Sequence, residues 1–171
     1  MNRSPLQVVT SVKTLFRLME DLSEASLYSA SIASGGSAVR EAFCETARLP
    51  EAVTRFLVEM DKKLDILVGR FQQESLSTHF PSQGRFVALS ATGATLQCRE
   101  PLAPGDCLEL ILVLQEFPFV SVVCRAMVVS SLADSVYAVA FQSVEEDDKE
   151  RLIQFIFQEE RRHIRSAKVM N

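Results

Sequence analysis

The fold is decided by the stretch Val87-Ala88-Leu89-Ser90-Ala91-Thr92-Gly93-Ala94-Thr95-Leu96. Apolar and β-branched residues flank a short segment of Ser, Ala, Thr and Gly, a pattern typical of two strands joined by a tight turn. Similar apolar segments follow it, and strands are expected at 85–90, 94–98, 107–114, 119–130 and 136–141. The connections are too short for helices, so we expect a small antiparallel barrel or sandwich and exclude a parallel α/β sheet.

Alternation predicts which side chains of these strands are buried. Leu108, Leu110 and Leu112 are expected to line one face, and Tyr137, Val139 and Phe141 are expected to line a face of the last strand. A terminal helix should begin at Ser143, with Glu146 completing a capping box. Its acidic residues come first, and the basic residues Arg161, Arg162, Arg165 and Lys168 come last, as the helix dipole favours.

Composition excludes several classes of function. The chain has 171 residues, 47% of them hydrophobic, and a net charge of -4, which is typical of one soluble domain with an appended element and unfavourable for binding nucleic acid. No apolar run is long enough to span a membrane. Cys44, Cys98, Cys107 and Cys124 form no metal-binding or disulfide pattern, and the absence of a signal peptide predicts a cytoplasmic protein with reduced thiols.

Catalysis and metal binding are not expected. The only histidines are His79, in a predicted linker, and His163, in a basic helix end, so no positioned base is evident. The cysteine spacing and the acidic run at 145–148 do not match a metal site, and no glycine-rich phosphate loop is present. We therefore predict no catalytic residues, no metal and no enzymatic activity.

Three helices are expected before the strands. Ser4-Pro5 can start a helix, and Val8, Val12, Leu15, Met19 and Leu22 recur at steps of four and three, which predicts a helix over 5–27. A Gly- and Ser-rich break and a short helix over 38–47 follow. The region 1–75 is thus interpreted as helical and oligomerising, 76–84 as a linker, and 85–171 as the barrel with its terminal helix.

The third helix, over 50–73, has the clearest periodicity. Its apolar residues follow coiled-coil spacing, and additional apolar residues flank the seam, which makes the stripe too wide for one partner helix. The predicted oligomer interface comprises Val53, Phe56, Leu57, Met60, Leu64, Leu67, Val68 and Phe71. Two alternatives remain: the helix over 5–27 folds back to cover the stripe, or copies of the chain assemble through it.

The order of these elements resembles the PilZ domain. The resemblance rests on Ser90 and Gly93 between two strands, the turn at 101–106, the long strand at 119–130 and the closing helix; the preceding heptad helix, with Met60-Asp61-Lys62-Lys63-Leu64-Asp65, is similar to the atypical, tetramer-forming bacterial branch. It implies a six-stranded barrel with its terminal helix over 85 to about 165. It also implies cyclic di-GMP as ligand, bound through R-x-x-x-R and [DN]-x-S-x-x-G motifs.

This chain departs from both motifs. Ser90 and Gly93 match the second one, but Ala88 stands where Asp or Asn is expected. Arg70 and Arg85 are too far apart for R-x-x-x-R, whose paired guanidiniums hold the ligand by forked hydrogen bonds. Gly93 therefore has a plain alternative role, supplying a positive φ, and Ser90 can bond the local backbone.

Three hypotheses of function follow. The first is a non-enzymatic bacterial regulatory adaptor with a degenerate PilZ domain, forming a homo-oligomer, most simply a tetramer, without a cofactor. The second is a cyclic di-GMP receptor with a non-canonical site formed by Arg85, Ser90, Gly93, Arg161, Arg162 and Arg165. The third is a protein-interaction module for a partner in motility, biofilm, virulence or secretion, docking through the barrel or the first helix.

Overall fold

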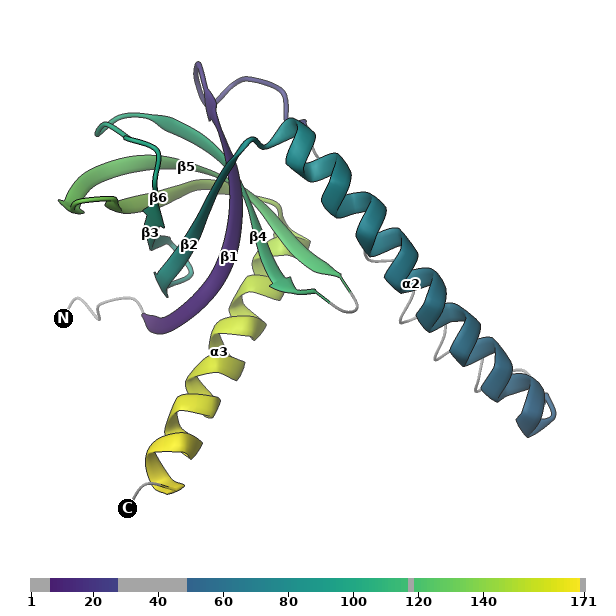
Figure 1. Ribbon diagram of the computed structural model, residues 1–171. Helices are drawn as coiled ribbons and strands as arrows, with labels where there is room; N and C mark the ends of the chain where they lie inside the picture. Colours follow the sequence, from purple (N-terminus) through teal and green to yellow (C-terminus); the bar gives the residue numbers. More distant parts are fainter. Residues whose placement is uncertain (1–6, 28–48, 117–118, 170–171) are drawn as a thin grey trace.

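The protein is a closed antiparallel barrel from which two helices project (Figure 1). The computed structural model describes residues 7–27, 49–116 and 119–169. The elements are β1 (Val8–Met19), α2 (Glu51–His79), β2 (Ser82–Leu89), β3 (Gly93–Cys98), β4 (Cys107–Gln115), β5 (Val120–Ala133), β6 (Val136–Val144) and α3 (Glu146–Val169). The strand order around the barrel is β1-β2-β3-β6-β5-β4. The predicted barrel and the five predicted strands are confirmed.

The inner face of the barrel forms the main core. Leu108, Leu110 and Leu112 of β4 are fully buried there, as alternation predicts. Tyr137 and Val139 of β6 belong to the same cluster, and the partly buried Phe141 packs against it. Leu152 and Ile156 of α3 also join this core, so the terminal helix closes the barrel by burying one apolar face.

The predicted helix over 5–27 is wrong, because residues Val8–Met19 form the sixth barrel strand. Val8, Val12 and Phe16 face the core, and a register shift lies between Val9 and Val12. Leu15 is buried on the opposite side of the strand, in a second cluster. The irregularity and the two-sided burial produce steps of four and three that imitate a helix, although the Val and Thr content favours a strand.

Helix α2 is an insertion between two paired strands. β1 pairs with β2 in an antiparallel register, yet the chain between them contains all of α2 (Figure 1). The helical region 1–75 is therefore not a separate unit, since it contains a strand of the barrel. The predicted linker over 76–84 is also wrong: its first residues complete α2, and Ser82 already belongs to β2. The helix predicted over 38–47 lies outside the described residues.

The end of α2 is fixed to the outer face of the barrel. Leu76 and Phe80 are 1% exposed and pack with Leu15, Ile111 and Phe119 in the second cluster. This contact explains why β4 is buried on both faces, and it holds the returning end of the insertion by the hydrophobic effect.

Helix α3 begins at Glu146, not at Ser143, which belongs to β6. Asp148, in its first turn, is 3% exposed and accepts a hydrogen bond from the Val123 amide at 2.9 Å. Arg151 donates to the other carboxylate oxygen of Asp148 at 2.8 Å. These contacts tie the start of α3 to β5. No helix in the described ranges is long and apolar enough to cross a membrane.

Candidate functional site

The turn between β2 and β3 contains the two residues that match the ligand motif. The Ser90 hydroxyl donates to the Gly93 carbonyl at 2.9 Å and accepts from the amides of Gly93 and Thr92 at 3.2 and 3.4 Å. Ser90 is 6% exposed. Its hydroxyl is thus engaged in holding the turn closed, which agrees with the local backbone role.

Gly93 is required by close packing between strands. A Cβ at this position would lie 2.5 Å from the Val139 carbonyl oxygen of β6, far below any ordinary contact. The φ of Gly93 is not positive. Among the described glycines, only Gly105 has a positive φ. The expectation of a positive φ at Gly93 is therefore wrong; a glycine is needed because β3 and β6 approach closely.

Arg85 lies in the middle of β2, apart from the turn. It is exposed, and its register partners are Lys13 of β1 and Gln97 of β3. A cation opposite Lys13 on the outer surface gives a small positive area. Arg70 is an exposed residue of α2, so the described residues before β2 offer no paired arginines in one segment.

Arg161, Arg162 and Arg165 lie on the half of α3 that extends beyond the core, and all three are exposed. His163 contacts the Val9 carbonyl, with its Nε2 at 2.6 Å, so this half passes the start of β1. At about 100° per residue, Arg161 and Arg165 lie roughly opposite His163 on the helix. They point away from that contact, and Arg162 pairs with Glu159 at 2.8 Å. Among the described residues, no hydrogen bond or ion pair joins these arginines to Ser90 or Gly93, although Val9 pairs with Ala88 of β2, close to the turn.

The predicted interface residues of α2 form an exposed apolar stripe. Val53, Phe56, Leu57, Met60, Leu64, Leu67, Val68 and Phe71 are between 41% and 70% exposed. Gly69 and Leu76 face the barrel: Leu76 is buried there, and a Cβ at Gly69 would contact Phe119 at 3.4 Å. These two positions lie about 120–160° around the helix from Leu64 and Phe71. The stripe therefore faces away from the barrel of its own chain.

A polar cluster that the sequence reasoning missed lies on the outer face of β1, β4 and β5. The strand registers place Arg17, Glu109 and Arg125 in one row. Arg17 Nε donates to Glu109 Oε2 at 2.6 Å, and the Glu109 side chain is completely buried. The only sequence signal was a carboxylate within the apolar strand Cys107–Gln115, which does not identify its partners.

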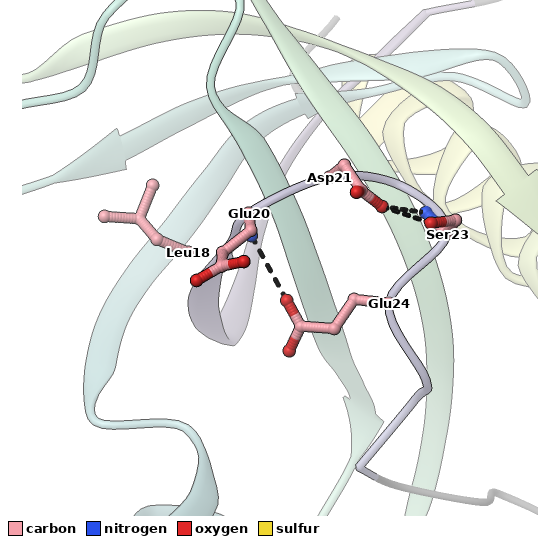
Figure 2. Close-up of a pocket in the computed structure, with 5 residues that line it drawn as sticks. All are labelled: Leu18, Glu20, Asp21, Ser23 and Glu24. Atoms are coloured by element: carbon pink, nitrogen blue, oxygen red, sulfur yellow. Dashed lines mark hydrogen bonds between the residues drawn. The ribbon is translucent and has the colours of Figure 1, made fainter.

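Residues 20–27, which we call the strap, cover this row. Arg17 also donates to the Glu24 carboxylate and to the Ala25 carbonyl, and Arg125 donates to the Leu22 carbonyl at 2.7 Å. Ser26 donates its hydroxyl to Glu109. Within the strap, Glu24 accepts from the Glu20 amide and Asp21 accepts from Ser23 (Figure 2).

The strap curves around a pocket lined by Leu18, Glu20, Asp21, Ser23 and Glu24 (Figure 2). Hydrogen bonds from Arg17 lower the pKa of Glu24, and those from Ser23 lower the pKa of Asp21. Both carboxylates are thus satisfied by the protein itself. Among the described residues, no group of three or more acidic, His or Cys side chains is arranged to hold a metal ion.

The thiols do not resemble nucleophiles. Desolvation raises the pKa of Cys98 to about 11, and it raises the pKa of the fully buried Cys124 still further. Cys107 is partly exposed, and Cys44 lies outside the described residues. A raised pKa disfavours the thiolate, which is the reactive form of cysteine.

These features define a small closed-barrel domain with a helical insertion. A family model described as PilZ domain matches residues 63–158, more than half of the chain, so the protein belongs to the PilZ domain family. The match begins inside α2, and β1 lies outside it. A search of curated proteins gave no match.

Solved structures to which this chain is similar include three proteins. A pathogenic protein from Xanthomonas campestris, described as a new tetrameric PilZ domain self-assembled via an unusual helical bundle, has a TM-score of 0.60 at 20% identity, covering 94% of this chain and 90% of that one. The Bacillus subtilis inhibitor of motility (MotI/DgrA) gives 0.48 at 10% identity, with 94% and 51% covered. The PilZ domain of CeSA from a cellulose-synthesizing bacterium gives 0.36 at 15% identity, with 46% and 79% covered.

Proposed function

We propose that this protein is a non-enzymatic bacterial regulatory adaptor of the cytoplasm, assembled through α2 into a homotetramer. The observation that carries the proposal is the apolar stripe of α2, which is exposed and faces away from its own barrel. Monomeric soluble proteins rarely leave a continuous apolar surface of this kind uncovered. The segment 5–27, once the intramolecular candidate for covering it, is not available because most of it forms β1 and the strap.

The shape of the stripe favours several helices over two. Phe56 and Val68 widen the seam beyond the positions that a two-stranded coil buries. Figure 1 shows α2 extending from the barrel as an arm, so helices from several copies have room to pack together. The bundle named for the Xanthomonas campestris protein is a precedent for this arrangement in the same fold.

The assembly is tested by placing charge in the stripe. We expect the double substitution Leu57→Glu and Leu64→Glu to yield monomers or dimers in light scattering, because each carboxylate would be desolvated in the bundle. Lys62→Glu is the matched control: it makes the same net charge change on roughly the opposite side of α2 and should leave the mass unchanged. If the double variant keeps the mass of the unaltered protein, α2 does not form the interface.

For the ligand, we propose that cyclic di-GMP is not bound in the usual mode. The sequence has no R-x-x-x-R motif before β2, and the contacts of Ser90 and Gly93 account for both residues without a ligand. Calorimetric titration with cyclic di-GMP tests this proposal, and no heat is expected. Micromolar binding that is lost on Arg85→Ala would instead support a receptor with a non-canonical site.

One observation keeps the receptor as a second candidate. Arg161 and Arg165 are exposed and point away from the β1 contact of their own α3, so in an assembly they are free to reach a neighbouring barrel. In that case Arg161→Ala with Arg165→Ala would abolish cyclic di-GMP binding and leave the mass unchanged. Docking of a motility or secretion partner through an N-terminal helix is withdrawn as a candidate, because that helix does not exist.

A further inference from the structure

The two ends of the helical insertion rest on the same outer face of the barrel but are held by different chemistry. The strand registers define adjacent rows across β1, β4 and β5: Leu15–Ile111–Val123 is apolar, and Arg17–Glu109–Arg125 is charged. The returning end of α2 covers the apolar row with Leu76 and Phe80. The outgoing end, the strap, covers the charged row.

The strap contributes hardly any buried apolar surface. Each of residues 20–27 is exposed or only partly buried, and Leu27 is 52% exposed. What holds it is a set of hydrogen bonds to three side chains of the barrel, Arg17, Glu109 and Arg125. A segment held in this way separates without exposing a hydrophobic core, and local openings of this type have low free energies.

The charged row is also a poor source of folding stability. Glu109 is fully buried, and a buried ion pair is often no more stable than apolar residues of similar volume. The neighbouring row, Leu15–Ile111–Val123, shows that the same strands can carry apolar residues on this face. In some proteins a buried charged group is retained because it makes a contact specific rather than more stable.

We propose that the strap is a latch: residues 20–27 detach as a unit from the Arg17–Glu109–Arg125 row while the barrel stays closed. Opening frees the first part of the connection from β1 to α2. It also uncovers the Glu109 carboxylate between the guanidiniums of Arg17 and Arg125, beside the apolar row that contacts the end of α2. Closing ties the insertion to the barrel at a second point. The latch is independent of whether the protein forms a tetramer.

Hydrogen exchange of the full-length protein tests the latch. The reporters are the amides of Glu20 and Leu27, which donate to Glu24 and Glu109 at 3.1 and 3.4 Å. We expect Glu24→Gln to speed their exchange about tenfold or more, as loss of a charged hydrogen bond implies, with no change in β4 and β5. Glu20→Gln is the control, since the Glu20 carboxylate forms no hydrogen bond with the described residues and its loss should leave the rates unchanged.

A second variant separates the latch from a structural role. In Arg17→Met with Glu109→Leu and Arg125→Met, the charged row becomes apolar like its neighbour, and we expect the strap to be released with no fall in the thermal midpoint of the barrel. If strap amides stay protected in both variants, the polar row does not hold the strap. If β4 and β5 open together with the strap, the strap is an integral part of the barrel; either result overturns the proposal.

Discussion

Arg17 and Glu109 lie 92 residues apart in the sequence, yet their side chains form a 2.6 Å hydrogen bond between neighbouring strands. This pair fixes the point at which the chain leaves the barrel toward α2. The returning chain is fixed one row away by Leu76 and Phe80. The helical arm of this PilZ barrel is thus an insertion whose two ends rest on the same outer face of the barrel. The arm presents its apolar stripe away from that barrel.

Gly93 should not tolerate a side chain. Gly93→Ala would place a methyl group against the Val139 carbonyl, and we expect it to lower the free energy of unfolding by about 1–3 kcal/mol through strain between β3 and β6. Urea denaturation measures this change. Thr92→Ala, at the exposed neighbouring position, serves as the control and should stay within about 0.5 kcal/mol. Equal stability of Gly93→Ala and the unaltered protein would contradict the close approach.

Strap attachment should weaken in acid. The pKa of Glu24 is lowered in the folded protein, chiefly by its hydrogen bond from Arg17, from an ordinary value of 4.5. The contribution of the Glu24 carboxylate to strap attachment is therefore complete above about pH 4.5. It is lost as the pH falls through the lower pKa that Glu24 has in the folded protein. The pKa of Asp21 is lowered too, so it acts in the same direction.

An NMR titration of the Glu20 amide measures this acid transition. We expect Glu24→Gln combined with Asp21→Asn to remove most of the pH dependence below pH 4.5, because neither replacement titrates. Glu20→Gln should preserve it. A transition of the same size and midpoint in the double variant would show that these two carboxylates do not control the strap.

The buried thiols should be unreactive in the native protein. With Cys44→Ser removing the cysteine outside the described residues, we expect iodoacetamide at pH 8 to label Cys107 first, since it is partly exposed. Burial raises the pKa of Cys98 to about 11 and that of Cys124 beyond it, so both should be labelled mainly after denaturation. Mass spectrometry of the peptides distinguishes the sites; equal native labelling of Cys107 and Cys124 would refute this ranking.

The parts of the fold that were predictable are those whose signals are local. Alternation identified the inward side chains of β4 and β6, and heptad spacing identified α2. β1 was mistaken for a helix because Leu15 packs outward beneath the end of α2, while Val12 and Phe16 pack inward. That arrangement depends on contacts distant in the sequence, which a periodicity pattern does not contain.

In the candidate site, too, the local contacts were predictable from the sequence and the contacts between distant segments were not. Ser90 was predicted to bond the local backbone, and its hydroxyl does so within the turn. The reason for Gly93 was missed because it lies on the neighbouring strand of the barrel, at Val139 of β6, which is distant in the sequence. Glu109 appeared in the sequence only as an interruption of an apolar strand; its partners come from β1 and the strap, and only the closed barrel brings them together.

The central claim is that the outward stripe of α2 assembles the protein, and the molar mass of the unaltered chain tests it most directly. Multi-angle light scattering on the purified protein, over a range of concentrations, should give a stable species at four times the chain mass of 19.1 kDa. A single species at 19.1 kDa across that range would contradict the account, because the apolar stripe would then be exposed in solution without a partner copy.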